Sequence, residues 1–245
     1  MRNNIAIIIP SYNAKNTVIK AIEGIFLILP EAKIFVVDDS SPDGTGNLIN
    51  QHLATEKRLR LIVRKEKSGR GSAVLRGLKE ALKDKHIQYF VEMDADLCHD
   101  PKYIPLLIEK CQKADVAIAS KYLKGSKIIG LEKKRVIFSK LVNLYLKLML
   151  RIPITDYTNG FRCYTRKALE QINLDSFYSK GFIVLSEIAY RIKQKGGTFA
   201  EIPFVFIFNK TNKSNFSLKE IREAFFTVLK LKFNPKPLQT WVMGK

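Results

Sequence analysis

The chain has 245 residues, of which 46% are apolar, so it can bury a substantial core without disulfides or structural metals. Its 42 Lys and Arg residues outnumber 23 Asp and Glu residues, and the formal net charge is +19. Three widely separated cysteines without the paired spacing of a zinc site argue against a disulfide framework and indicate reduced thiols in a cytoplasmic protein.

The positive charge has two explanations. It either serves an anionic membrane surface, where each nearby Lys or Arg contributes about 1 kcal/mol, or only keeps a lysine-rich protein soluble. We favour the membrane, because no nucleic-acid-binding module is present and no nucleic-acid partner is expected. No secretory leader or membrane-spanning run is predicted either. We therefore expect a cytoplasmic protein, peripheral at the inner face of a membrane.

From the N-terminus, apolar runs alternate with helical patterns. This alternation predicts an α/β fold with a mostly parallel central sheet flanked by helices. Strands are expected at 4–9, 33–37, 59–64, 87–93 and 115–120. Helices are expected near 15–28, 45–56, 71–84 and 101–113.

After the fifth strand the alternation changes. The expected elements are then, in order, a long helix at 131–151, a strand at 161–165, a helix at 184–195 and a strand at 199–207. Ser217 and Glu220 form a capping box that predicts a last amphipathic helix to about Phe233. Because no repeat or low-complexity linker divides the chain, we predict one domain over 1–233 and a short basic tail, 234–245.

Two acidic clusters directly follow predicted apolar strands. Asp38 and Asp39 end the second strand, and Asp94 and Asp96 end the fourth. Ligands of open α/β sheets bind at the carboxyl ends of strands, so both clusters should line one crevice. Carboxylates repel phosphate, but they can hold Mg²⁺ or Mn²⁺, which in turn holds a diphosphate. The clusters therefore predict a nucleotide-diphosphate site.

Two further features lie beside this predicted crevice. Asp39 can accept hydrogen bonds from a ribose or base, whereas a cap for the next helix fits Asp43 better. Gly69-Arg70-Gly71 precedes a predicted helix, whose first N–H groups favour an anion. A plain left-handed turn explains these glycines equally well.

Several separated motifs combine into a resemblance. They are Ile9-Pro10-Ser11-Tyr12-Asn13, Ser41-Pro42-Asp43-Gly44-Thr45, Gly69-Arg70-Gly71, Met93-Asp94-Ala95-Asp96 and Thr158-Asn159-Gly160-Phe161-Arg162. Together they resemble the inverting family 2 glycosyltransferases of the GT-A fold, nearest to the dolichol- or polyprenol-phosphate mannose synthases. The resemblance implies a metal-dependent inverting transfer of a sugar from a nucleotide-sugar donor, with GDP-mannose favoured, to a polyprenyl or dolichyl phosphate.

The resemblance also implies residue roles on the donor side. The nucleoside would contact Pro10, Tyr12, Val37 and Asp39, and the ribose, diphosphate and metal would contact Asp94, Ala95 and Asp96. The metal, Mg²⁺ or Mn²⁺, is assigned to Asp94 and Asp96, with Asp96 as the most direct ligand. The family keeps a loop beside the donor that corresponds here to Gly69 and Arg70.

The acceptor is assigned to the long helix at 131–151. Arg135, Ser139 and Asn143 recur every four residues, so they share one face. The helix either packs in the core or lies at a membrane interface, with its apolar side in lipid and its polar face on a phosphate. In the resembling synthases a matching Arg and Ser engage the lipid phosphate, and they correspond to Arg135 and Ser139. Arg135 joins Asp94 and Asp96 as the predicted catalytic set.

A lipid phosphate is already an anion, so its transfer needs positioning and no general base. Asp156 would contact the donor sugar, or serve as a base if the acceptor were a hydroxyl, and a loop-stabilising role is the alternative. Two alternative functions stay open. One is transfer from a uridine diphosphate sugar to a hydroxyl acceptor in glycan or polysaccharide synthesis, and the other is an inactive basic binding module. A separate membrane-anchoring protein stays open as a partner.

The chain departs from the synthase pattern at several positions. Ala14 replaces a Glu, and Lys121 replaces an Arg, which keeps the charge but loses the bidentate fork. Cys98 stands at a polar position and is a poor Mg²⁺ ligand. Near the C-terminus, an Arg and a Lys that flank the donor phosphates correspond to Asn209 and Asn215, for which the candidate substitutes are Lys210 and Lys213. We assign Lys121 and Lys210 to the donor.

Overall fold

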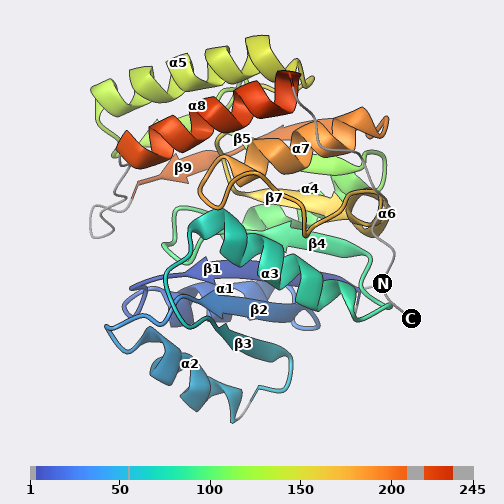
Figure 1. The fold of residues 1–245 in the computed structure, drawn as a ribbon. Coiled ribbons are helices and arrows are strands. Elements are labelled where there is room, and N and C mark those ends of the chain that lie inside the picture. Colours follow the sequence, from blue (N-terminus) through green and yellow to red (C-terminus); the bar gives the residue numbers. More distant parts are fainter. Residues whose placement is uncertain (1–3, 55, 209–217, 234–245) are drawn as a thin grey trace.

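The computed structural model describes residues 4–54, 56–208 and 218–233. Its centre is a seven-stranded sheet in the order β3-β2-β1-β4-β7-β5-β8, accompanied by a two-stranded sheet of β6 and β9 (Figure 1). The strands are β1 (Ile5–Ser11), β2 (Lys33–Asp38), β3 (Leu59–Val63), β4 (Tyr89–Glu92), β5 (Val116–Ser120), β6 (Lys127–Ile129), β7 (Arg162–Thr165), β8 (Phe199–Pro203) and β9 (Val205–Ile207). Only the pairings of β7 are antiparallel among the described strands. The predicted mostly parallel α/β fold is confirmed.

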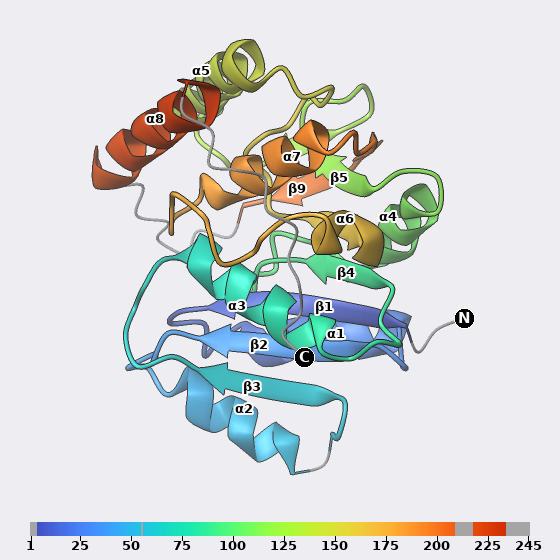
Figure 2. The ribbon, with the colours of Figure 1, turned by 45° about the vertical axis from the view of Figure 1, so that its right-hand side comes forward.

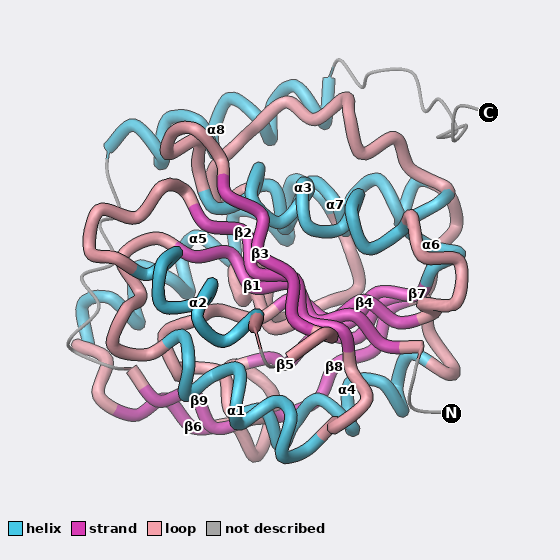
Figure 3. The backbone as a smooth tube through the Cα atoms, turned by 90° about the horizontal axis from the view of Figure 1, so that it is seen from below, coloured by secondary structure: helices cyan, strands magenta, loops and turns pink. Residues whose placement is uncertain are grey.

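Helices cover both faces of the central sheet. They are α1 (Val18–Ile28), α2 (Thr45–Leu53), α3 (Arg70–Leu82), the 3-10 helix η1 (Pro101–Tyr103), α4 (Ile104–Cys111), α5 (Lys133–Leu150), α6 (Arg166–Glu170), α7 (Val184–Gln194) and α8 (Leu218–Phe233). Figure 3 shows α3 and α7 on one side of the strands and α1 and α4 on the other. Because both faces are covered, a strand such as β1 is buried along its whole length and reads as a continuous apolar run.

The predicted strand at 199–207 is wrong in one respect, because the structure divides it between two sheets. β8 pairs with β5, and after Pro203 the chain crosses to pair as β9 with β6. Proline has no N–H to donate, which favours a break in the ladder at this point. β6 and α6 were not predicted, since three or five residues give too short a pattern to recognise.

Helices α5 and α8 lie side by side at one end of the molecule, far from β3 (Figures 1 and 2). α8 begins at Leu218, so the helix predicted to run to about Phe233 is confirmed, while its Ser217 cap lies outside the described residues. Among the described helices none is both long and apolar enough to cross a membrane. The basic tail at 234–245 also lies outside the described residues.

Candidate active site

The carboxyl ends of β1, β2 and β4 meet at one edge of the sheet. In the register of the sheet, Pro10 of β1 stands beside Val37 of β2. Three non-glycine residues in the loops that follow these strands adopt the left-handed conformation, Asn13 (φ 56°), Ser40 (φ 50°) and Leu97 (φ 66°). Backbone strain of this kind gathers at functional sites, so this edge is the candidate site.

The nucleoside side of this edge is organised by a buried ion pair. Arg64 donates from Nε to Oδ1 of Asp39 at 2.5 Å and from Nη2 to Oδ2 at 2.6 Å. Ser68 donates its backbone N–H to the same carboxylate, and its neighbour Lys67 lies 4.0 Å from the centroid of the exposed Tyr12 ring. The site therefore offers a fixed carboxylate beside an aromatic surface, which suits a nucleoside.

Arg64 was missed by the sequence analysis. The available signal was its position directly after β3, the parallel neighbour of the strand that carries Asp39. Asp43, by contrast, holds the start of α2 as expected, although it stands one residue before the N-cap, which is Gly44. Its Oδ1 accepts hydrogen bonds from the backbone N–H and the hydroxyl of Thr45 at the start of α2.

The Gly69-Arg70 loop is packed against a distant segment. Gly69 has φ +94°, and a Cβ there would lie 2.6 Å from the carbonyl oxygen of Lys180. The same carbonyl accepts the N–H of Ser72 at 2.9 Å, so only glycine allows this approach. Arg70, the first residue of α3, is thereby directed across the strand ends to the acidic motif that follows β4.

That acidic motif carries the carboxylates predicted to bind metal. Arg70 donates to Oδ1 of Asp94 from Nε and Nη2, at 2.9 and 2.5 Å. Burial works to raise the pKa of Asp94, but Arg70 and other nearby cations outweigh it, so the pKa lies below its ordinary value and the group is ionised at neutral pH. Asp96 accepts the N–H of Cys98 through Oδ1. Ala95 between them is buried.

The described residues contain no group of three His, Cys, Asp or Glu side chains placed to hold a metal ion. Two carboxylates still fit Mg²⁺ or Mn²⁺, because such ions commonly take one or two carboxylates and complete their shell with water and substrate phosphates. The donor set here therefore fits a cation that arrives together with a diphosphate.

A buried histidine, which no sequence motif indicated, connects the acidic motif to the Thr158–Arg162 segment. His99 accepts the backbone N–H of Asp94 at Nδ1, 3.0 Å away, which leaves its proton on Nε2. Nε2 lies 3.1 Å from Oδ1 of Asn159, and the amide Nδ2 of Asn159 donates to the carbonyl of Ala119. Burial lowers the pKa of His99, so the ring is neutral and holds the backbone of Asp94 in place.

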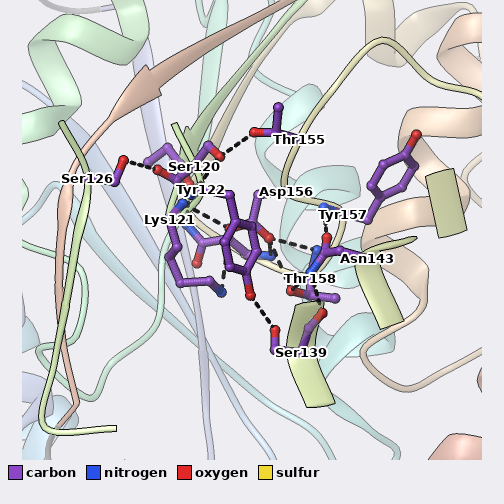
Figure 4. Close-up of polar contacts among 12 residues, drawn as sticks. Ser120, Lys121, Tyr122, Ser126, Ser139, Asn143, Thr155, Asp156, Tyr157 and Thr158 are labelled. Atoms are coloured by element: carbon purple, nitrogen blue, oxygen red, sulfur yellow. Dashed lines mark hydrogen bonds and ion pairs between the residues drawn. The ribbon is translucent and has the colours of Figure 1, made fainter. Parts of the chain in front are cut away.

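Asp156 is fully buried, and both of its oxygens are occupied (Figure 4). Oδ1 accepts from the backbone N–H of Thr158 and of Asn159, and from the Thr158 hydroxyl. Oδ2 accepts the N–H of Lys121 and lies 3.6 Å from its Nζ. Of the roles left open for Asp156, the structure supports the loop-stabilising one, and through it Asp156 positions Lys121.

The Arg162 side chain of the same segment is also structural. It is fully buried and donates to the main-chain carbonyls of Asp156, Tyr157, Asn159 and Leu185. This arginine therefore shapes the loop.

The polar residues of α5 point toward Lys121 and its neighbour. The Tyr122 hydroxyl donates to Oγ of Ser139 at 2.7 Å (Figure 4). Lys121 Nζ lies 5.3 Å from the ring centroid of Phe206, and the Arg135 guanidinium carbon lies 5.1 Å from that of Phe208. Two cations thus stand over alternate residues in and just after β9, and one of them, Arg135, is one helical turn from Ser139, an arrangement suited to a phosphate.

Both faces of α5 carry apolar side chains: Leu146 and Leu150 are buried in the core, and a second set is exposed on the outer face. Asn143 is buried, accepts the N–H of Tyr157 and donates to the carbonyl of Ser139. The opposite face exposes large apolar side chains, Ile137, Phe138, Leu141, Leu144 and Leu148, by 42–65%. On α8 the exposed apolar side chains are Ile221, Phe225, Phe226 and Phe233. We call this combined surface the α5–α8 apolar face.

The residues predicted near the C-terminus cannot be placed relative to the site. Lys210, Lys213, Asn209 and Asn215 lie outside the described residues. The three cysteines are buried and form no disulfide, and Cys98 contributes its backbone N–H to Asp96.

A family model described as glycosyl transferase family 2 matches residues 6–173, more than half of the chain. The chain belongs to this family. It is therefore a glycosyltransferase, and the strand ends described above are its candidate active site.

This glycosyltransferase is 35% identical to the polyprenol monophosphomannose synthase of Mycolicibacterium smegmatis, over 91% of this chain and 84% of that protein. It is 32% identical to the undecaprenyl-phosphate mannosyltransferase of Micrococcus luteus, over 90% of each. Glucosyl-3-phosphoglycerate synthase from Mycobacterium tuberculosis, in complex with Mn²⁺, uridine diphosphate and glucosyl-3-phosphoglycerate, superposes with a TM-score of 0.65. That pair shares 18% identity over 96% of this chain and 82% of the other, which confirms the predicted GT-A fold.

Proposed function

We propose that this glycosyltransferase transfers a sugar, with mannose from GDP-mannose the favoured donor, to a polyprenyl or dolichyl monophosphate. The observation that carries this proposal concerns α5. On one face of this helix Ser139 is hydrogen-bonded to Tyr122, the neighbour of Lys121, and the other face exposes apolar side chains. A lipid phosphate needs both, because its head group must reach a polar site while its chain stays in apolar surroundings. The two relatives named above are a polyprenol and an undecaprenyl-phosphate enzyme.

On the donor side, the proposal gives each part of the nucleotide sugar a place. The nucleoside lies against Pro10, Tyr12, Val37 and Asp39, and the diphosphate lies near Gly69, Arg70, Asp94, Ala95, Asp96 and Lys121. Asp94 and Asp96 would hold a divalent cation, which would supply charge stabilisation to the departing diphosphate. Arg70 and Lys121 add positive charge from the protein at the same place.

The acceptor phosphate oxygen attacks the anomeric carbon with inversion, and the bond to the nucleoside diphosphate breaks. No proton has to be removed from a phosphate monoester anion. The structure of Asp156 supports this choice of acceptor, since its buried and fully hydrogen-bonded carboxylate is poorly placed to accept a proton from a hydroxyl. A uridine diphosphate sugar is the second candidate donor, because the superposed synthase was solved with uridine diphosphate.

The proposal is tested with a panel of radiolabelled nucleotide sugars, each incubated with polyprenyl phosphate and Mn²⁺. Extraction into organic solvent then separates glycosylated lipid from donor. We expect labelled lipid from GDP-mannose only when both the lipid phosphate and the cation are present. Label that stays in the aqueous phase with every donor, and moves instead to a soluble glycan, would overturn the lipid-phosphate assignment.

We also propose that the α5–α8 apolar face rests on an anionic membrane. Exposed lysines Lys133, Lys140 and Lys147 accompany the apolar side chains along α5. Purified protein should therefore bind anionic vesicles and release them as salt rises, because screening acts over about 8 Å at physiological ionic strength. Leu144→Gln should weaken vesicle binding by about fivefold to tenfold in co-sedimentation, since it removes a half-exposed apolar side chain from the face.

Leu27→Gln is the matched control, because Leu27 is 82% exposed on α1, away from the α5–α8 apolar face. It should leave vesicle binding unchanged. Equal binding to neutral and anionic vesicles, or an equal loss for both variants, would contradict the proposed orientation.

A smaller prediction concerns the Tyr122 hydroxyl, which we infer orients Ser139 toward the acceptor. Tyr122→Phe removes one hydrogen bond, whose net worth is about 0.5–1.5 kcal/mol. The efficiency with polyprenyl phosphate should fall by about twofold to tenfold, while the apparent donor constant stays unchanged. A change in the donor constant alone would show that Tyr122 acts on the nucleotide side.

A further inference from the structure

The guanidinium of Arg70 lies between two carboxylates that differ in their surroundings. Its Nη1 donates to Oε1 of Glu92 at 2.6 Å, and its Nε and Nη2 both donate to Oδ1 of Asp94. Glu92 is completely buried, whereas the side chain of Asp94 keeps 30% of its exposure. One partner is therefore permanent, and the other faces the site where a cation and a diphosphate would arrive.

The position of this guanidinium is built by its neighbours. A Cβ on Gly160 would lie 2.2 Å from Nη2 of Arg70, so the glycine leaves the space that the guanidinium fills. The ring of Phe182 lies 5.7 Å from the guanidinium carbon. Tyr164 donates its hydroxyl to Oε2 of Glu92 at 3.2 Å and fixes the far side of that carboxylate. Such a closely fitted site indicates a specific role for Arg70.

A divalent cation and a guanidinium cannot share one carboxylate oxygen without repulsion. Both contacts from Arg70 fall on Oδ1 of Asp94, so a cation on either oxygen of this carboxylate lies close to the guanidinium, and like-charge repulsion favours the release of Arg70. Glu92 stays paired with Nη1 during this exchange, because it is buried and has no exposed position to move to.

We propose that Arg70 is the internal counter-ion of Asp94 in the metal-free enzyme, that the divalent cation displaces it, and that Glu92 is the positioning residue that keeps the released guanidinium beside the diphosphate. This inference rests on the proposed metal and diphosphate site. Its consequence is that metal and nucleotide bind cooperatively: the cation alone competes with Arg70, but a diphosphate attracts both positive charges.

The test is calorimetric titration of the full chain with Mn²⁺ alone, followed by guanosine and uridine diphosphate at saturating Mn²⁺. Arg70→Gln should lower the dissociation constant of Mn²⁺ by about fivefold or more, because the competing cation is gone. The same variant should bind the nucleoside diphosphate less tightly. The dissociation constants of Mn²⁺ and of the nucleoside diphosphate should therefore change in opposite directions. A merely structural loss would weaken the binding of both ligands.

Arg58→Gln is the charge-matched control, because Arg58 pairs with Glu56 and Glu31 at the surface. It should change neither constant. Arg70→Lys keeps the charge without the fork, so it should tighten Mn²⁺ binding only in part. If Arg70→Gln fails to fold, the double variant Glu92→Gln with Arg70→Gln removes both buried charges and should also bind Mn²⁺ more tightly than wild type.

Glu92→Gln tests the positioning role by itself. It leaves the guanidinium with Asp94 as its carboxylate partner, so Mn²⁺ should bind more weakly while the fold is kept. If wild type binds Mn²⁺ and Arg70→Gln binds it no more tightly, this inference is wrong and the metal site stands. If wild type binds no Mn²⁺ even with a nucleoside diphosphate, the proposed metal site itself is wrong.

Discussion

Asp96→Asn is expected to remove most sugar transfer while leaving the fold nearly intact. Asparagine keeps an oxygen that can accept the N–H of Cys98, so the loop retains its hydrogen bond. It withdraws a charged ligand from the cation, whose stabilisation of the leaving diphosphate is worth several kcal/mol. A loss of that size lowers the turnover number by about two or more orders of magnitude. Initial rates at saturating donor and Mn²⁺ measure the loss of transfer, and thermal unfolding measures whether the fold is kept.

The matched control is Asp100→Asn, the same chemical change four residues along. Asp100 accepts the N–H of Lys102 at the start of η1 and lies outside the proposed site. Its variant should transfer sugar at nearly the wild-type rate. Wild-type turnover by Asp96→Asn under saturating conditions would show that Asp96 is not a metal ligand.

Arg135→Ala is expected to weaken the use of polyprenyl phosphate far more than the use of the donor. Arg135 and Ser139 stand one helical turn apart on α5, and a guanidinium can hold a phosphate through two hydrogen bonds. Such a charge-assisted contact is worth about 1.5–3 kcal/mol, which corresponds to about one to two decades in acceptor efficiency. Steady-state kinetics with the lipid in detergent micelles separates the acceptor constant from the donor constant.

Arg135→Lys should recover only part of this loss, because an ammonium keeps the charge without the fork. Lys134→Ala is the control, since it removes one charge from an exposed position on the same helix. It should change the acceptor constant little. A rise in the donor constant of Arg135→Ala, with the acceptor constant unchanged, would move α5 to the donor side and remove the main residue-level support for the lipid phosphate.

Local pattern was enough to predict the mostly parallel central sheet and to place the predicted site residues at the ends of its strands. Each apolar run long enough to cross the sheet ends at a polar residue, so the sequence alone places Asp39, Asp94 and Asp96 at strand ends. The carboxyl ends of parallel neighbours meet at one edge whatever the loops do, because parallel strands share one direction. The role of Asp43 at the start of α2 was predictable for the same reason, since it involves a residue only two positions away.

The partners of these residues were decided by the tertiary structure. Arg64 meets Asp39 across 25 positions, and His99 meets Asn159 across 60, and neither separation follows any local period. The sequence also did not show which polar side chains are buried. Asp156 could be read as a base or as a loop residue until the fold enclosed it and filled its acceptor sites.

Helix α5 shows the limit most clearly. The four-residue spacing of Arg135, Ser139 and Asn143 predicted that they share a face, and all three lie on α5. Periodicity alone, however, does not say which face of the helix turns inward. A rule that buries leucine would have turned Leu141 and Leu144 to the core. The structure turns Leu146 and Leu150 inward and buries Asn143 with them, because the Asn143 amide satisfies the backbone N–H of Tyr157 and the carbonyl of Ser139. Tyr157 is 14 positions from Asn143 in the sequence, so this pairing is identified only when the chain has folded.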